Sequence, residues 1–215
     1  DVGAVRSSNQ DACDGGLFSK ESAWAVVCDG MGGANGGNVA SAMAVESIRR
    51  RLLEGFHQDI TREGVRSLLL EAVTEANRVV YRRSQEEQEL RGMGTTAVVL
   101  VASKGTLHVA HVGDSRAYLR HQGELSQITM DHSYVQDLVN FGQITPAEAR
   151  IHPKRNIITR VLGVHEQVRC DYNAWDFSPG DVALACSDGL SNYMEDELLE
   201  EYLDKYCLLY TSPSP

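Results

Sequence analysis

Two short apolar segments that lie far apart in the chain end in the same way, and this repetition constrains the fold more than any other feature. Residues 24–28 are followed by Asp29-Gly30, and residues 182–186 lead through one serine to Asp188-Gly189. Short apolar runs with β-branched residues predict buried strands, and a glycine after a carboxylate lets the backbone approach another group closely. A single Asp-Gly pair is typical of an ordinary turn. Two such pairs at strand ends predict carboxylates that converge on one cation.

The composition is that of a globular domain. The chain has 215 residues, of which 42% are hydrophobic and 23% are charged, so a single domain can bury a substantial core. The net charge of -10 and the alternation of basic with acidic residues argue against a nucleic-acid partner, because phosphate backbones require clustered Lys and Arg. No apolar run approaches the ~18 residues that span a bilayer, so no membrane segment is predicted in this stretch.

The cysteine and histidine residues show no metal-binding spacing. Five Cys, an odd number, lack any CxxC pair, which argues against a disulfide framework or a zinc site and favours a reducing cytoplasm. Cys28 and Cys186 end apolar runs without a basic neighbour, so we interpret them as packing residues and not as nucleophiles. The seven His lack HxxxH and HExxH spacing and are interpreted as structural or solvated.

Both ends of the chain have unusual features. The sequence opens at Asp1 with no Met and no signal-like segment, so we expect a clipped N-terminus. Residues 207–215 depart abruptly from the acidic segment before them and resemble a translated sequencing-library adapter. We therefore treat 207–215 as a non-native tail and residues 1–206 as the domain, and we expect a different native continuation after about Tyr206.

Hydrophobic spacing predicts the layers of the fold. Apolar residues recur at three-and-four spacing in residues 45–56 and 65–80, which predicts two amphipathic helices. Residues 95–102, 107–112 and 116–120 are predicted strands, and their short connections imply antiparallel neighbours. Since residues 95–102 are apolar on both faces, their sheet is expected to be covered on both sides. These features predict an α+β fold with sheets stacked between helical layers.

Residues 131–163 have a different character. Residues 145–148 (Thr-Pro-Ala-Glu) form a capping box that predicts a short helix, and polar and basic residues surround it. The segment is interpreted as an irregular excursion that covers or gates a site, with a plain surface insertion as the alternative. Downstream, residues 168–172 and 175–177 alternate as strands do, and residues 196–206 form a predicted acidic amphipathic helix.

Four aspartates and one arginine are the candidate functional residues. Asp29 and Asp188 end predicted strands, and Asp11 and Asp114 are expected in loops. Carboxylate oxygens suit Mg²⁺ or Mn²⁺ better than zinc or copper. Two such cations that share a carboxylate can activate a water and hold a phosphoryl group, so phosphate-ester hydrolysis is expected, although strand-ending aspartates also build phosphotransfer and Ca²⁺ sites. Arg6 is either a surface cation or, beside such metals, a ligand that holds a phosphate through two hydrogen bonds.

Six motifs occur in the order seen in one known family. They are Arg6-Ser7-Ser8-Asn9-Gln10-Asp11, Asp29-Gly30-Met31-Gly32-Gly33, Gly94-Thr95-Thr96, Gly113-Asp114-Ser115-Arg116, Asn156-Ile157-Ile158-Thr159-Arg160-Val161-Leu162-Gly163 and Ser187-Asp188-Gly189-Leu190. On these motifs the chain resembles the type 2C metal-dependent serine/threonine protein phosphatases, the PPM family. It is most similar to the bacterial branch, in which Asp-Gly-Met-Gly-Gly is usual. The match extends from Asp1 to about Tyr206.

The resemblance implies a four-layer α/β/β/α sandwich with two central antiparallel sheets. It also implies an enzyme that hydrolyses phosphoserine and phosphothreonine in proteins with a metal-activated water and without a phosphoenzyme. The implied cofactors are two core Mn²⁺ or Mg²⁺ ions, with a weaker third ion. The implied partners are phosphorylated proteins, including those modified by a Ser/Thr kinase.

The resemblance also implies roles for individual residues. By position, Asp29 would bridge the two core metals, and the Gly30 carbonyl would bind one of them. Asp188 would bind the first metal, Asp11 the second metal through water, and Asp114 the weaker third metal.

Other positions concern the substrate or depart from the family. Arg6 would bind the substrate phosphate, and residues 131–163 would be the flap that tunes substrate access. Gln10 stands where many relatives have a Glu, which lowers the charge near the second metal. Met31 replaces the His of eukaryotic members, so water or another residue must protonate the leaving group. Nothing after Asp188 supplies the further Asp that relatives carry in a final Asp-Asn strand.

Two hypotheses follow for the function. The first is an active Mg²⁺- or Mn²⁺-dependent phosphatase, and the second is a non-catalytic relative that keeps the fold as a binding or regulatory module. The joint retention of the arginine and the four aspartates favours the enzyme. The polypeptide as it stands is expected to be impaired, because a two-metal site that lacks one carboxylate is under-ligated.

Overall fold

A computed structural model describes residues 9–32 and 36–207 of the chain. The helices are α1 (Gly36–Gly55), α2 (Arg62–Glu86), the short 3-10 helix η1 (Gln88–Leu90), α3 (Tyr134–Asn140), α4 (Pro146–Ile151), α5 (Asp188–Ser191) and α6 (Asp196–Cys207). The strands are β1 (Asp11–Ser19), β2 (Ser22–Met31), β3 (Gly94–Thr95), β4 (Ala97–Ser103), β5 (Thr106–Val112), β6 (Arg116–His121), β7 (Glu124–Gln127), β8 (Asp171–Asp176) and β9 (Val182–Cys186).

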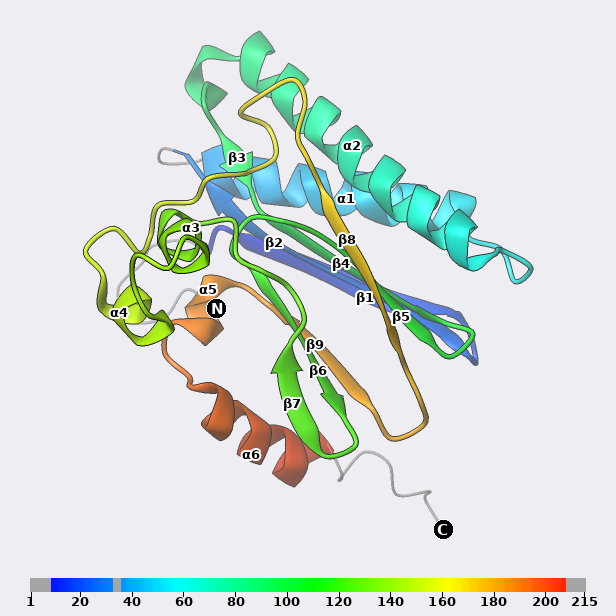
Figure 1. Ribbon diagram of the computed structural model, residues 1–215. Coiled ribbons are helices and arrows are strands. Elements are labelled where there is room, and N and C mark those ends of the chain that lie inside the picture. The colour runs from blue at the N-terminus through cyan, green and yellow to red at the C-terminus, as the bar shows by residue number, and fades with distance from the viewer. Residues whose placement is uncertain (1–8, 33–35, 208–215) are drawn as a thin grey trace.

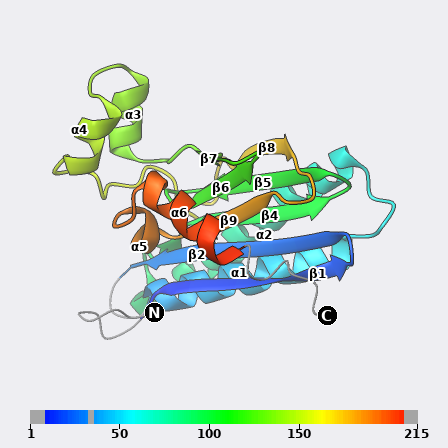
Figure 2. The same ribbon diagram turned by 90° about the horizontal axis from the view of Figure 1, so that it is seen from below.

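The strands form two antiparallel sheets that lie face to face at the middle of the molecule (Figure 1, Figure 2). The larger sheet has the order β1-β2-β4-β5-β8, with β3 paired to β2, and the smaller sheet has the order β7-β6-β9. The two strands expected at 168–172 and 175–177 are instead the single strand β8, which pairs with β5. The antiparallel neighbours expected from short connections are confirmed for β4 and β5. They are wrong for β5 and β6, because the short loop at 113–115 carries the chain from the larger sheet to the smaller one.

Strand β4 shows why the larger sheet is covered on both sides. Successive residues of a strand point to opposite faces. Val99 and Val101 pack into the cluster formed with α1 and α2, whereas Val98 and Leu100 pack into a second cluster with Leu119 of β6. The apolar character of both faces of this strand therefore reflects its position between a helical layer and the smaller sheet.

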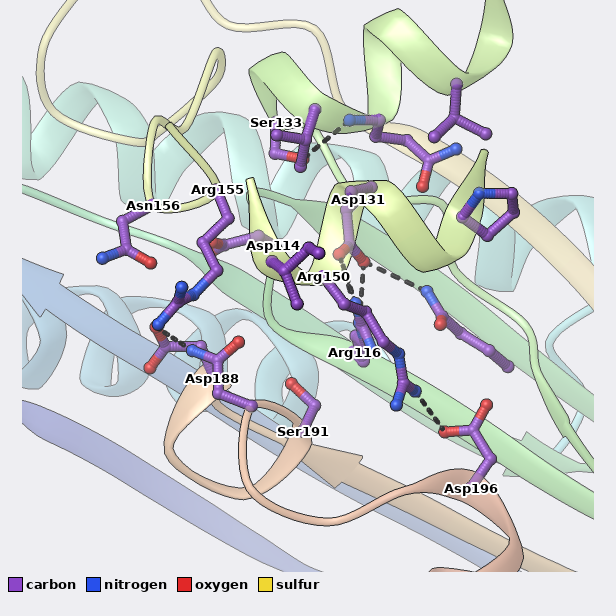
Figure 3. Close-up of a pocket in the computed structure, with 18 residues that line it drawn as sticks. Asp114, Arg116, Asp131, Ser133, Arg150, Arg155, Asn156, Asp188, Ser191 and Asp196 are labelled. Carbon is purple, nitrogen blue, oxygen red and sulfur yellow. Dashed lines mark hydrogen bonds and ion pairs between the residues drawn. The ribbon is translucent and has the colours of Figure 1, made fainter. Parts of the chain in front are cut away.

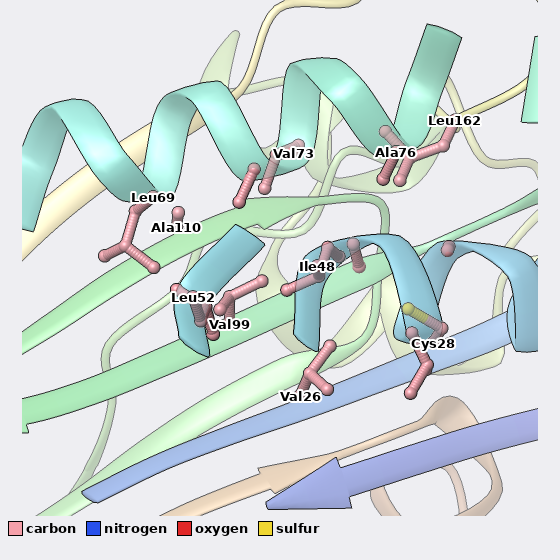
Figure 4. Close-up of a cluster of buried hydrophobic side chains, with 14 of the residues drawn as sticks. Val26, Cys28, Ile48, Leu52, Leu69, Val73, Ala76, Val99, Ala110 and Leu162 are labelled. Atoms are coloured by element: carbon pink, nitrogen blue, oxygen red, sulfur yellow. The ribbon is translucent and has the colours of Figure 1, made fainter. Parts of the chain in front are cut away.

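Helices α1 and α2 cover the outer face of the larger sheet (Figure 4). Ile48 and Leu52 of α1, with Leu69 and Val73 of α2, have no exposed surface and form the centre of this core. Helix α2 begins after Thr61, whose hydroxyl accepts a hydrogen bond from the backbone amide three residues later at 3.0 Å. The two amphipathic helices predicted from the apolar spacing are confirmed.

Helix α6 forms the fourth layer, on the outer face of the smaller sheet (Figure 1). Its Leu199 packs on Tyr118 of β6 and Cys186 of β9. The order from one face to the other is α1 and α2, the larger sheet, the smaller sheet, and α6, which confirms the four-layer sandwich. Among the described residues, no helix is both long enough and apolar enough to cross a membrane.

The interpretation of two cysteines as packing residues is consistent with their surroundings. Both Cys28 and Cys186 are buried. Burial raises the pKa of the Cys186 thiol to about 11 and raises the pKa of the Cys28 thiol further. A thiol with a raised pKa is protonated at neutral pH and is a poor nucleophile.

Residues 131–163 form an excursion with two short helices at one end of the sandwich (Figure 2). The expected capping box opens α4: Thr145 Oγ1 accepts from the Glu148 amide at 3.2 Å, and the Glu148 carboxylate accepts from the Thr145 amide at 2.7 Å. Helix α3 was not predicted. The two ends of the excursion meet where Ser133 and Ile158 form an isolated β-bridge, so the segment leaves and rejoins the sandwich at one place.

We expect that Ile48→Ala lowers the free energy of unfolding by about 3 kcal/mol, because the buried side chain leaves a cavity between α1 and the sheet. Leu53→Ala is the matched control on the same helix, since Leu53 is 47% exposed, and it should change stability by less than about 0.5 kcal/mol. Urea unfolding of both variants measures the difference. Equal losses for the two variants would contradict the assignment of the core.

Candidate metal centre

Asp11 and Asp29 lie directly opposite each other on neighbouring antiparallel strands. Asp11 is the first residue of β1, so the expectation that it lies in a loop is wrong. Strand β2 also continues to Met31 instead of ending at Asp29, because Gly30 and Met31 pair with β3. Residues directly opposite in an antiparallel pair have Cβ atoms about 4.5–5.5 Å apart. A single hairpin therefore places two carboxylates side by side.

Asp188 and Asp114 reach the same region from other elements. Asp188 is the first residue of α5, shortly after β9, and Asp114 lies in the loop between β5 and β6. Burial, followed by the carboxylates of Asp11 and Asp188, raises the pKa of Asp29 to about 8. Burial, followed by Asp188 and Asp131, raises the pKa of Asp114 to about 7. Asp188 therefore lies close enough to raise the pKa of both Asp29 and Asp114, and the four predicted carboxylates lie in one region.

The backbone of Asp29 is held by two consecutive threonines. Its amide donates to Thr96 Oγ1 at 2.8 Å, and its carbonyl accepts from the Thr96 amide and from Thr95 Oγ1, both at 2.9 Å. Thr96 Oγ1 also lies 2.6 Å from the hydroxyl oxygen of Ser115, which follows Asp114. The Gly94-Thr95-Thr96 motif thus links two of the candidate ligands, a role that its spacing in the sequence does not predict.

Gly30 fits its position only because it has no side chain. A Cβ atom built on Gly30 would lie 2.0 Å from the carbonyl oxygen of Gly37 and 2.6 Å from that of Gln10. The Gly30 amide donates to the same Gln10 carbonyl at 3.0 Å, and Ser41 Oγ donates to it at 2.6 Å. The start of α1 and the residue before β1 are thereby packed directly against the backbone beside Asp29.

The residues on either side of α5 form hydrogen bonds to two of the carboxylates, those of Asp11 and Asp188. Ser187 Oγ donates to Asp11 Oδ2 at 3.0 Å, across 176 positions of sequence. Asn192 Nδ2 donates to Asp188 Oδ2 at 3.0 Å. Ser187 and Asn192 are therefore supporting residues that orient Asp11 and Asp188.

A cavity of about 520 Å³ opens beside these carboxylates (Figure 3). Asp114 and Asp188 line it on one side, and residues from 131–163, among them Arg150 and Arg155, line it on the other. The two carboxylates of the β1-β2 hairpin are not among its lining residues. The cavity adjoins the carboxylate cluster and leaves room for a ligand larger than a metal ion.

The donor set fits hard divalent cations. All four converging side chains are carboxylates, which favour Mg²⁺ and Mn²⁺. Burial, followed by repulsion from Asp11 and Asp188, raises the pKa of Asp29, and a bound cation would offset both effects. Within residues 9–32 and 36–207 no group of three or more His, Cys, Asp or Glu is already arranged as a metal site, so the carboxylates would have to adjust on binding. Arg6, the expected phosphate ligand, lies outside the described residues.

Comparison with known proteins identifies the family. The model of the family "Protein phosphatase 2C" matches residues 4–213. The serine/threonine phosphatase Stp of Listeria monocytogenes serotype 4b is 38% identical over 209 residues, which cover 94% of this chain and 80% of that protein. The serine/threonine protein phosphatase PstP of Mycobacterium tuberculosis is 38% identical over 205 residues, which cover 94% of this chain and 37% of that protein.

Solved structures agree with the sequence comparisons. The serine/threonine phosphatase Stp1 from Staphylococcus aureus has a TM-score of 0.85 and 35% identity, covering 100% of this chain and 81% of that one. The catalytic domain of PstP, in complex with two manganese ions, has a TM-score of 0.81 and 35% identity, covering 95% of this chain and 81% of that one.

The four-layer fold and the cluster of carboxylates are those of a metal-dependent protein phosphatase. The chain belongs to the protein phosphatase 2C family. It is a serine/threonine protein phosphatase, and its substrates are phosphoproteins.

Only one of the two Asp-Gly glycines is required by packing. We expect that Gly30→Ala destabilises the protein by about 1–3 kcal/mol or more, because its Cβ would overlap the carbonyl of Gly37. Gly189→Ala is the matched control, since the nearest atom to its Cβ is 3.6 Å away, and a change below about 1 kcal/mol is expected. Urea unfolding of the two variants measures the difference in their free energies of unfolding. A Gly30→Ala variant as stable as Gly189→Ala would contradict the observed packing.

Removal of divalent cations should reverse the effect of Asp29→Asn on stability. The pKa of Asp29 in the folded protein, about 8, lies above its value in the unfolded chain. The protonated carboxyl therefore stabilises the fold fully below about pH 4, and this stabilisation is lost as the pH rises through 8. With EDTA at about pH 8, Asp29→Asn should therefore be more stable than the wild type. With saturating Mn²⁺ it should be less stable, because it loses bound metal. Thermal unfolding of the wild type and of Asp29→Asn, each with EDTA and with Mn²⁺, tests this prediction. A variant that is less stable than the wild type in EDTA as well as in Mn²⁺ would refute it.

Proposed function

We propose that Asp29, Asp11 and Asp188 hold two divalent cations, Mn²⁺ or Mg²⁺, at which phosphoserine and phosphothreonine are hydrolysed. The observation that carries this proposal is the position of Asp29 directly opposite Asp11 and beside Asp188. Burial, followed by these two carboxylates, raises the pKa of Asp29 to about 8. When bound, such cations supply an activated water and neutralise charge on the phosphoryl oxygens. Asp29, which lies opposite Asp11 and is influenced by Asp188, would bridge the two ions.

Three further residues would contribute to the proposed site. The Gly30 carbonyl would add one backbone ligand, and the close packing of this glycine supports the idea that its backbone position is fixed. Asp114, with its raised pKa and its place on the cavity wall, would serve a third, weaker cation. Arg6 would hold the substrate phosphate with its planar guanidinium.

Residues 131–163 would act as a flap that tunes access of the phosphoprotein. Helices α3 and α4 supply much of the cavity wall opposite Asp188. Arg150 of α4 points across the cavity toward the start of α6 (Figure 3), with nitrogen to oxygen distances of 3.6 Å to Glu195 and 4.0 Å to Asp196. These partly exposed pairs contribute little stability, so the flap can move away from α6 at low cost.

The substrate and location are proposed from chemistry and relatedness. We infer that the substrates include proteins modified by a Ser/Thr kinase, because such a kinase makes the phosphoesters that this site would hydrolyse. A cytoplasmic location is supported by Cys residues that are unbridged among those described. The net charge of -10 disfavours nucleic acid as a partner. The alternative of a non-catalytic module is not favoured, since the named relatives are phosphatases.

Turnover of a phosphothreonine peptide with Mn²⁺ tests the proposal. Asp29→Asn should lower kcat/KM by at least about 100-fold, because the bridging carboxylate is lost, and EDTA should abolish the wild-type activity. The matched control is Asp14→Asn on the same hairpin, where Asp14 forms an exposed ion pair with Arg49 at 3.2 Å. It should change kcat/KM by less than about twofold. Turnover that is insensitive to EDTA, or that survives Asp29→Asn, would refute the mechanism.

A further inference from the structure

Asp131 and His132, the first two residues of the flap segment 131–163, form hydrogen bonds to residues that precede and follow Asp114. Asp131 accepts from Arg116, two residues after Asp114, at 3.0 Å to Nε and 2.7 Å to Nη2 (Figure 3). His132 binds Gly113, the residue before Asp114, through both backbone and side chain. The loop that carries Asp114 is therefore attached to the flap on both sides.

The contact between His132 and Gly113 is close and buried. The His132 amide donates to the Gly113 carbonyl at 2.9 Å, and the Gly113 amide donates to His132 Nδ1 at 3.1 Å. Gly113 has a φ of +109°, and a Cβ atom there would lie 2.6 Å from Thr96, so no other residue fits this position easily. The backbone amide and the backbone carbonyl of Gly113 are thus both hydrogen-bonded to His132.

The hydrogen bonds of the ring fix its tautomer. The Gly113 amide can only donate, so Nδ1 must accept, and a neutral ring then carries its proton on Nε2. His132 Nε2 lies 3.2 Å from Asp171 Oδ2 and 3.0 Å from Arg160 Nη1, and the same Arg160 nitrogen lies 2.9 Å from Asp171 Oδ1. Because Arg160 can only donate and a protonated Nε2 cannot accept, the Arg160 N–H is directed to Asp171 Oδ1. Asp171 therefore accepts from both donors. The opposite tautomer would turn a second donor toward the buried amide of Gly113 and leave that amide without a partner.

The same histidine also joins the two ends of the flap. Its carbonyl accepts from the amide of Thr159 at 2.8 Å, and the next residue, Ser133, forms a β-bridge with Ile158. The ring of His111 stacks on that of His132, with centroids 4.6 Å apart and an interplanar angle of 14°. Burial lowers the pKa of His132 to about 4, which keeps the ring neutral at neutral pH, as its acceptor role requires.

We propose that His132 is a positioning residue for Asp114: it holds the Gly113 backbone through Nδ1, in a tautomer that Asp171 fixes, and so couples the flap to the third cation site. The proposal rests on the proposed role of Asp114 as a metal ligand. Because this contact joins the flap to the loop that carries Asp114, binding of a cation at Asp114 and binding of a substrate against the flap should each change the affinity for the other.

Two substitutions separate this role from a general effect on folding. An Asn side chain places its amide oxygen near the position of Nδ1, so His132→Asn can still accept from Gly113. A Gln side chain places its polar group near Nε2, so His132→Gln can keep the contact with Asp171 but loses the bond to Gly113. Thermal unfolding of both variants in EDTA checks that they remain folded.

The first readout is hydrogen exchange of the Gly113 amide in the metal-free protein, and the second is calorimetric titration with Mn²⁺, with Asp114→Asn as the reference that lacks the third site. His132→Gln should speed hydrogen exchange of the Gly113 amide at least about tenfold. It should also weaken, by about 10-fold or more, the Mn²⁺-binding step that is missing in Asp114→Asn. His132→Asn should leave both close to wild type. Equal effects of Asn and Gln, or an unchanged binding step with Gln, would overturn the proposal.

A measurement on the unmodified protein avoids the risk that the variants misfold. Nitrogen NMR of the wild type labelled at histidine should show His132 protonated at Nε2 and unprotonated at Nδ1 near neutral pH. Protonation at Nδ1 would overturn the proposal, because the Gly113 bond could not form. The peptide assay with Asp29→Asn is independent of these results, so a failure of the proposed two-metal mechanism is distinguishable from a failure of the role of His132.

Discussion

The repulsion between Asp29 and its neighbouring carboxylates is the constraint on which the rest of the site depends. The antiparallel register of β1 and β2 sets Asp11 directly opposite Asp29, and α5 brings Asp188 to the same point. Like charges placed together in a partly buried site destabilise the folded state unless a proton or a cation offsets them. The chain therefore folds into a state that favours binding of divalent cations.

The layers of the fold explain how this arrangement is held. The larger sheet is covered on one face by α1 and α2 and on the other by the smaller sheet, so β2 and β4 are fixed by two clusters of buried residues. Thr96 binds the backbone of Asp29 and the hydroxyl of Ser115, and Ser187 binds Asp11. These polar contacts hold the backbone beside Asp29 and the Asp11 side chain against the buried core, while the carboxylates themselves adjust on metal binding.

The sequence predicts the parts of the structure that arise from local periodicity and leaves out those that arise from distant contacts. The stripes of α1 and α2 and the doubly apolar β4 are local, and each is confirmed in place. The strand-Asp-Gly pattern locates Asp29 and Asp188 only approximately, because β2 continues to Met31 and Asp188 begins α5. Asp11 was expected in a loop because its strand, β1, is half exposed and rich in small residues. The contacts of Thr96 with Ser115 and of His132 with Gly113 join positions 19 residues apart, and no local pattern marks them.

The most direct test of the account is a crystal structure of the protein grown with Mn²⁺, with anomalous scattering used to locate the metal. The account predicts two strong peaks, both within about 2.0–2.3 Å of carboxylate oxygens of Asp29, with Asp188 on one ion and Asp11 near the other. Peaks that avoid Asp29, or a single ion held by other side chains, would contradict the claim that the crowded carboxylate bridges two cations.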